Sequence, residues 1–260
     1  MIDTHCHLTF PQLFDQLDAV LARAHGEGVD CMITVGTSPD DAERAAALAA
    51  AEEDIFATSG LHPHYVEKWD DRPALVDRLT TLAGHPQVVA MGEMGLDYHY
   101  PDPPRDVQQR AFGWQLEMLA DLPRDLPIVI HNRKATDDVL AMIRDAGLPG
   151  ERFVFHCFTG DRAELDAILA TGAMVSFTGI VTFSSARDLA EASDAVPIER
   201  LMIETDSPYL TPEPHRKVRP NEPRYVADVA RFLARRRGLS VPQFTTRTDA
   251  NATRFFRLPG

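Results

Sequence analysis

The fold of this chain is constrained most by a regular alternation of short apolar runs with amphipathic segments along its 260 residues. Eight apolar runs have the length of strands and cover residues 2–4, 31–35, 55–61, 88–92, 127–131, 153–157, 173–177 and 201–204. Strands separated by single helices form βαβ units in a parallel sheet. Eight successive units favour an α/β (β/α)8 barrel, the TIM barrel, over an open doubly wound sheet. We therefore predict one barrel domain over residues 1–260.

Helical patterns fill the intervals between these runs. Residues 12–26 repeat apolar positions close to the 3.6-residue period, and residues 40–52 are alanine-rich and follow Ser38 and Pro39, a suitable N-cap and first-turn pair. The other predicted helices are 73–83, 106–120, 136–146, 162–170, 186–195, 223–236 and 241–256. No Gly-x-Gly-x-x-Gly follows the first strand, so the dinucleotide-binding fold lacks its main signal.

Composition and charge exclude several classes of protein. Hydrophobic residues make up 44% of the chain and charged residues 25%, which indicates a globular protein with a large core. The net charge of −13 argues against a broad basic surface that coats nucleic acid. The sequence predicts neither a secretory leader nor an apolar stretch long enough to cross a membrane. Three widely separated cysteines, Cys6, Cys31 and Cys157, predict a reducing, cytoplasmic location.

Imidazoles and carboxylates cluster at the carboxyl ends of six predicted strands. These side chains are His5, His7, His62, His64, Glu93, His131, His156, Glu204 and Asp206. In a (β/α)8 barrel the carboxyl ends of the strands converge on one face, where active sites are built. His5 and His7 are two residues apart on one strand, so both can face the barrel axis while Cys6 points outward. A single strand-end histidine is more often structural, but the joint pattern indicates a metal site.

The predicted donor set consists of imidazole nitrogens and carboxylate oxygens. It suits zinc, manganese, iron or cobalt and can also hold magnesium. Related barrel hydrolases often bridge two cations with a carbamylated lysine, but here Lys134 lies three residues beyond the strand-end histidine. We expect one divalent cation at the two histidines of the first strand together with Asp206. The second is expected at His131 and His156, with Glu93 shared by both cations.

These side chains lie in motifs that resemble the TatD family of metal-dependent deoxyribonucleases. The motifs are IDTHCH at 2–7, GLHPH at 60–64, GEMGLDY at 92–98, IH at 130–131, FHCFTG at 155–160, ETDSPYL at 204–210, NEP at 221–223 and NA at 251–252. The resemblance runs in order from residue 2 to about residue 256. It implies a barrel of the amidohydrolase superfamily, two divalent metals, phosphodiester hydrolysis on DNA, and the same six ligands. At Lys134 the family often has an acid, and this reversed charge bears on substrate preference rather than on the metals.

Other polar residues near the strand ends have candidate roles in catalysis and substrate binding. Asp206 is expected to position the nucleophile as ligand or base. One of His62 and His64 could bind a phosphate oxygen or protonate the leaving 3′ oxygen; alternatively, they belong to a loop braced by proline. Glu204 could orient His62 or a metal ligand, or pair with an arginine at the edge of the core. Arg133 is a candidate phosphate clamp, because guanidinium matches phosphate oxygens in a bidentate way.

Three functions are compatible with these residues. The first is hydrolysis of DNA, with single-stranded ends as the expected substrate and no obligate protein partner evident. The second is a two-metal hydrolase of a small ester, amide or phosphotriester, or of the ester on an aminoacyl-tRNA. The third is a non-catalytic binding barrel. A local basic run, Arg216, Lys217 and Arg219, either follows a nucleic-acid backbone or is a solvated face.

Overall fold

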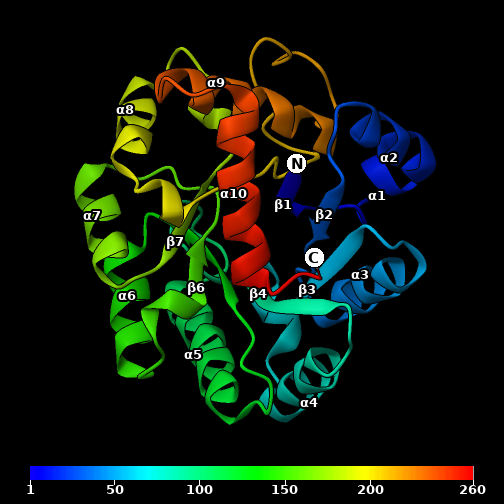
Figure 1. Ribbon diagram of the computed structural model, residues 1–260. Helices are drawn as coiled ribbons and strands as arrows, with labels where there is room; N and C mark the ends of the chain where they lie inside the picture. Colours follow the sequence, from blue (N-terminus) through cyan, green and yellow to red (C-terminus); the bar gives the residue numbers. More distant parts are fainter. Residues whose placement is uncertain (260) are drawn as a thin grey trace.

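The computed structural model describes residues 1–259 and shows a parallel eight-stranded barrel surrounded by helices (Figure 1). The strands are β1 (Ile2–Cys6), β2 (Cys31–Thr34), β3 (Ile55–Ser59), β4 (Val88–Asp97), β5 (Ile128–Arg133), β6 (Phe153–Phe155), β7 (Met174–Phe177) and β8 (Leu201–Ile203). Each strand pairs in parallel with the next along the chain, in the order β1 to β8. The predicted (β/α)8 class and the eight strand positions are confirmed.

The seam between β1 and β8 closes the barrel at its carboxyl end. Cys6 forms a parallel bridge with Ser207. The His7 amide donates to the Ser207 carbonyl at 2.8 Å, and the Asp206 amide donates to the His5 carbonyl at 2.9 Å. Three of the predicted metal ligands therefore sit on the backbone hydrogen bonds that complete the barrel. The Cys6 thiol, as expected, faces away from the axis and packs among the residues under the helices.

The helices form the outer layer, except for the last one, which lies across the barrel (Figure 1). They are α1 (Pro11–Phe14), α2 (Leu17–Gly26), α3 (Pro39–Ala51), α4 (Arg72–Ala83), α5 (Arg105–Asp121), α6 (Thr136–Asp145), α7 (Arg162–Ala170), α8 (Arg187–Ala195), α9 (Val226–Arg236) and α10 (Val241–Phe256). Side-chain caps mark several starts: Ser38 accepts from the Asp41 amide, and Ser240 forms a capping box with Gln243. Within residues 1–259, no helix combines the length and apolar character needed to cross a bilayer.

Two predicted helices are divided differently in the structure, whereas the others agree with the predicted bounds to within one residue. The expected helix 12–26 is divided into α1 and α2, because the backbone of Gln16, at φ −135° and ψ 31°, leaves the helical region. Its amide bonds instead to the carbonyl of Leu13, a tight turn that keeps the Leu13 side chain buried. The expected helix 223–236 begins with a 3-10 turn, η5 (Pro223–Tyr225), before α9.

Strand β4 is longer than the predicted run 88–92 and carries a bulge. Its pairing with β5 shifts register in the middle, and the strand continues to Asp97. Gly92 and Gly95 have positive φ values of 117° and 140°. A Cβ at these glycines would lie 2.4 Å and 2.0 Å from carbonyl oxygens of β5, so only glycine fits. The bulge keeps Glu93 inside the strand and leaves its carboxylate buried at the barrel mouth.

An apolar layer fills the opposite, amino-terminal mouth. All eight strands contribute side chains to it, and these are Ile2, Ile33, Phe56, Val89, Ala90, Val129, Val154, Met174 and Met202. Ala252, Phe256 and Leu258 cover this layer from the end of the chain, and Figure 1 shows α10 lying across the barrel. The amide of Asn251 holds the helix there by donating to the carbonyls of Ile198 and Leu201 at 2.6 and 2.9 Å. The apolar layer and α10 therefore close the amino-terminal mouth, and a catalytic site is expected at the carboxyl-terminal mouth.

The three cysteines are free thiols in the structure. The cytoplasmic location that we inferred from them stays a prediction.

Candidate metal centre

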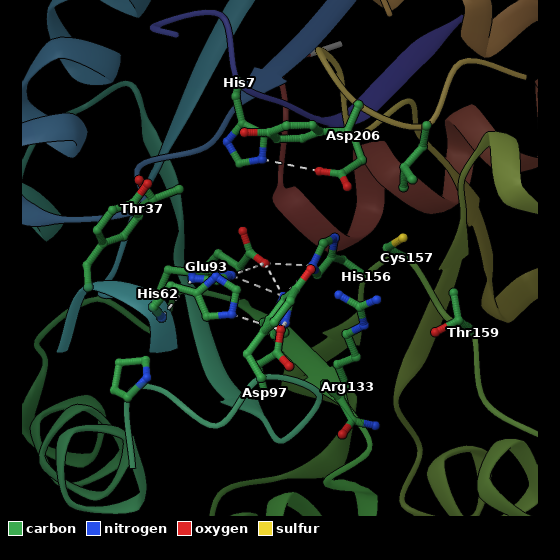
Figure 2. Close-up of a pocket in the computed structure, with 18 of the residues that line it drawn as sticks. His7, Thr37, His62, Glu93, Asp97, Arg133, His156, Cys157, Thr159 and Asp206 are labelled. Atoms are coloured by element: carbon green, nitrogen blue, oxygen red, sulfur yellow. Dashed lines mark hydrogen bonds and ion pairs between the residues drawn. The ribbon is translucent and has the colours of Figure 1, made fainter. Parts of the chain in front are cut away.

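The carboxyl ends of the strands bring imidazoles and carboxylates into one cluster, which Figure 2 shows in close-up. Three sets of side chains place their donor atoms within 4.8 Å of one another, and these sets are His5–His7–Asp206, His5–Glu93–His156 and His62–Glu93–His131. All six predicted ligands are present in the cluster. His62 joins them as a further donor, although its sequence motif suggested a catalytic role instead.

Glu93 lies at the centre of this cluster. Its Oε1 is 2.7 Å from His131 Nδ1, 2.7 Å from His156 Nε2 and 3.5 Å from His62 Nε2. Its Oε2 is 3.4 Å from His5 Nε2. Burial alone raises the pKa of Glu93, but the surrounding imidazoles, led by His156 and His62, lower it well below the usual range. Glu93 is therefore an ionised carboxylate with several donors around one oxygen, as expected of a shared ligand.

Asp206 faces the histidines of β1 from the end of β8. Its Oδ1 is 3.2 Å from His7 Nε2 and 3.7 Å from His5 Nε2. Its backbone is left-handed, with φ 54°, which turns the chain so that the carboxylate points at β1. Such strained residues concentrate at functional sites. Burial raises the pKa of Asp206, but the hydrogen bond with His7 outweighs it, and the net pKa is lowered.

The nitrogens of His5 provide a test of whether a cation fits. The side chain is fully buried, and within residues 1–259 neither ring nitrogen has a hydrogen-bond partner. The 3.4 Å approach of Nε2 to Glu93 lacks hydrogen-bond geometry. An unsatisfied buried polar atom costs about 1–3 kcal/mol. Burial, followed by the nearby His156, lowers the pKa of His5, so the ring is neutral and has a free lone pair. A divalent cation beside Nε2 would use that lone pair, and the residues fit one.

Asp97 is a residue of the candidate site that the sequence reasoning missed. Its Oδ2 is 2.9 Å from His64 Nε2 and 3.2 Å from His131 Nε2. The pKa of Asp97 is lowered, because hydrogen bonds with His131 and His64 outweigh its burial. With Nε2 of His131 held by Asp97, Nδ1 is directed at Glu93, which is the arrangement of a carboxylate that orients a metal-bound histidine. Asp97 lies in the GEMGLDY motif but beyond the predicted end of its strand.

Glu204 contacts His156 rather than His62. Its Oε1 accepts from the Cys157 amide at 2.6 Å and lies 3.4 Å from His156 Nδ1. Its Oε2 accepts from the Ser176 hydroxyl at 2.5 Å. Within residues 1–259 its polar partners include neither His62 nor an arginine, which corrects two of the three expected roles. Glu204 is buried and does not line the pocket, so its side chain lies beside His156 and behind the pocket wall.

The cluster opens into a pocket of about 1010 Å³. His64 and Arg133, the predicted substrate-binding residues, both line it. The Arg133 guanidinium lies 5.4 Å above the ring of Tyr100, and within residues 1–259 no carboxylate forms an ion pair with it. In Figure 2 the Arg133 side chain extends into the space beside Asp97.

The basic run after β8 lies outside this pocket. Arg216 packs its guanidinium 3.6 Å from the centre of the Phe183 ring. Arg219 donates to Thr211 Oγ1 at 3.2 Å and to neighbouring backbone carbonyls. Neither these arginines nor Lys217 lines the pocket, so the structure does not bring the run to the metal centre.

Known proteins match this chain over nearly its whole length. The profile of the TatD-related DNase family matches residues 2–257. A *Bacillus subtilis* protein named "Uncharacterized metal-dependent hydrolase YabD" is 36% identical, with 99% of both chains covered. The "3'-5' ssDNA/RNA exonuclease TatD" of *Klebsiella pneumoniae* is 36% identical, over 98% of this chain and 97% of its own. Among solved structures, the TatD homologue YjjV of *Escherichia coli* superposes with a TM-score of 0.92 at 28% identity, covering 100% of this chain and 98% of its own.

Proposed function

The chain belongs to the family of TatD-related DNases and is a metal-dependent hydrolase, and from this premise we propose that it removes nucleotides from the 3′ ends of single-stranded DNA. The observation that carries the proposal is the buried cluster around Glu93, in which His5 has two unpartnered ring nitrogens within residues 1–259. The substrate is suggested by the name of the Klebsiella relative, a 3'-5' exonuclease of single-stranded DNA and RNA. Because the chain is a hydrolase, the third function considered above, a non-catalytic binding barrel, is excluded.

We assign two divalent cations to this cluster. The set His5–His7–Asp206 supports one of them. His131 and His156 support the second, and Glu93 is close enough to both groups to be shared. When bound, the two cations would neutralise charge on the phosphoryl oxygens and lower the pKa of an attacking water.

The chain's own side chains then handle protons and orientation. Asp206 stays ionised and lines the pocket, so it can accept a proton from the attacking water. Burial lowers the pKa of His62 well below its usual value, which makes it a poor proton donor. His64 is more exposed, and Asp97 orients its ring, so we assign to His64 the contact with the leaving 3′ oxygen. Arg133 binds a neighbouring phosphate from the same wall of the pocket.

The proposal is tested with protein that has been stripped of metal and reloaded with one cation at a time. We expect 5′-labelled single-stranded DNA to shorten in a ladder, and 3′-labelled DNA to release its label first as a mononucleotide. Chelator should abolish both reactions, and blunt duplex should react much more slowly. Small esters, amides and aminoacyl-tRNA are assayed in parallel. A higher kcat/KM for one of these, without a DNA ladder, would replace the proposed activity by the second alternative.

A further inference from the structure

Two exposed aromatic rings lie in the wall of the pocket. In residues 1–259 the large apolar side chains with the greatest exposure are Phe14 at 53%, Tyr100 at 49%, Tyr209 at 49% and Val218 at 38%. Only Tyr100 and Tyr209 among these four line the pocket. Exposed apolar surface inside a concave site is typical of a surface that a ligand covers.

The two rings stand on opposite sides of the metal centre. Tyr100 follows β4, and its ring centre is 5.5 Å from that of His64. Tyr209 follows β8, and its ring centre is 6.3 Å from that of His7. β4 and β8 are four strands apart in an eight-stranded barrel, so they occupy opposite points of its rim. The donors around Glu93 therefore lie between the two tyrosines.

Each ring is supported by a neighbouring side chain. The Arg133 guanidinium lies 5.4 Å from the centre of the Tyr100 ring. Phe10 meets Tyr209 edge to face, with ring centres 6.4 Å apart and an interplanar angle of 81°. Phe10 in turn stacks on His7, with ring centres 4.7 Å apart. The tyrosines are thus held at the rim while about half of each side chain remains open to a ligand.

The charge of the protein limits the other means of holding DNA. The chain carries a net charge of −13, and Arg133 is the only arginine or lysine that lines the pocket in residues 1–259. Attraction between phosphates and basic side chains, the usual source of affinity for nucleic acid, is therefore weak here. Stacking of bases on aromatic rings does not depend on protein charge, and every base offers a face to it.

We propose that Tyr100 and Tyr209 are base-stacking platforms for two nucleotides of single-stranded DNA, one on each side of the phosphate that is cleaved. This inference rests on the proposed function. It adds a reason for preferring single strands, because the faces of bases inside a duplex are covered by neighbouring base pairs. It also assigns Arg133 to the phosphate next to the base on Tyr100, since the two side chains are in contact.

The test compares the loss of a ring with the loss of a base. Tyr100→Leu and Tyr209→Leu remove the rings, Tyr100→Phe and Tyr209→Phe retain them, and Phe14→Leu removes an exposed ring outside the pocket. The substrates are a single-stranded oligonucleotide and the same strand with abasic sugars at its two 3′-terminal positions. With metal-loaded protein, each Leu variant is expected to lose about 5-fold to 150-fold in kcat/KM on the intact strand. On the abasic strand it should match wild type within about 2-fold, because no base is left to stack.

The two Phe variants should keep most of the activity on intact DNA, and Phe14→Leu should match wild type. An equal loss on intact and abasic strands would overturn the platforms while leaving the nuclease activity standing. Failure of the wild type to cleave single-stranded DNA would overturn the proposed function and the platforms together.

A binding measurement gives a readout independent of cleavage. Fluorescence anisotropy of labelled DNA in chelator is expected to show weaker binding of intact DNA by both Leu variants than by wild type. Equal dissociation constants for wild type and the Leu variants would overturn the platforms.

Discussion

At the amino-terminal mouth of the barrel, apolar side chains from all eight strands pack under α10, whereas at the carboxyl-terminal mouth imidazoles and carboxylates surround an open pocket. The first mouth buries apolar surface, which stabilises the fold. The second buries polar groups whose desolvation is unfavourable unless a partner or a cation compensates it. The comparison teaches that stability and chemistry are separated along the length of the same eight strands. Substitutions at the two mouths should therefore have separable effects.

The largest expected effect is on stability, from Phe256→Ala. Phe256 is 2% exposed and packs on the apolar layer at the closed mouth. Removing the ring leaves a cavity and should cost about 3–5 kcal/mol of the free energy of unfolding, measured by urea denaturation. The adjacent and less buried Phe255 provides a matched control, since Phe255→Ala should cost less. Metal content per folded molecule should not change. A variant that kept its stability but lost metal would contradict the separation of the two mouths.

The next largest effect is expected at the open mouth from Glu93→Gln, which should reduce metal binding and activity. The substitution preserves shape but removes the charge of the shared carboxylate. Loss of a residue that only orients a ligand costs about 10-fold to 100-fold, so loss of a shared ligand should cost at least about 100-fold in kcat/KM. Elemental analysis should show less bound metal per folded molecule.

An exposed carboxylate serves as the control for Glu93. Glu117 pairs with Arg72 on the outer helices and is 61% exposed, so Glu117→Gln should leave both activity and metal content unchanged. Full metal occupancy and activity in Glu93→Gln would remove that carboxylate from the site.

The cluster of candidate ligands could be predicted from the sequence because its signal is local. His5, His131 and His156 each lie at or just beyond the end of an apolar run, and the barrel brings such ends together whatever the detailed register. The same reasoning located Glu93 and Asp206. Fold class and candidate metal site were therefore both accessible from the pattern of strand ends.

The supporting residues could not be predicted because their roles depend on contacts between distant strands. Gly92 and Gly95 look like the end of a strand, since glycine weakens strands, and only the close carbonyls of β5 show that a bulge requires them. This hid Asp97 at the true end of β4. The partner of Glu204 likewise depends on β7 and on the turn after β6, which supply Ser176 and the Cys157 amide.

At the open mouth, Asp97→Asn is expected to reduce metal affinity or kcat/KM less than Glu93→Gln does. The amide keeps the shape of the carboxylate but loses the charge that orients His131 and His64. We expect metal affinity or kcat/KM to fall about 10-fold to 100-fold. Metal titration and single-turnover cleavage should separate weaker binding from slower chemistry. If neither changes, Asp97 is only a structural partner of the two rings.

The smallest effect is expected at the closed mouth from Asn251→Ala. Asn251 is buried and donates to the carbonyls of Ile198 and Leu201 at 2.6 and 2.9 Å. Each lost hydrogen bond contributes about 0.5–1.5 kcal/mol, so the free energy of unfolding should fall by about 1–3 kcal/mol, below the loss for Phe256→Ala at this mouth. The measurement is the urea midpoint, with nuclease rate and metal content recorded on the same samples. The hydrogen bonds of Asn251 lie on the far side of the apolar layer from Glu93. A fall in metal content at unchanged stability would therefore show that the two mouths are coupled through the strands.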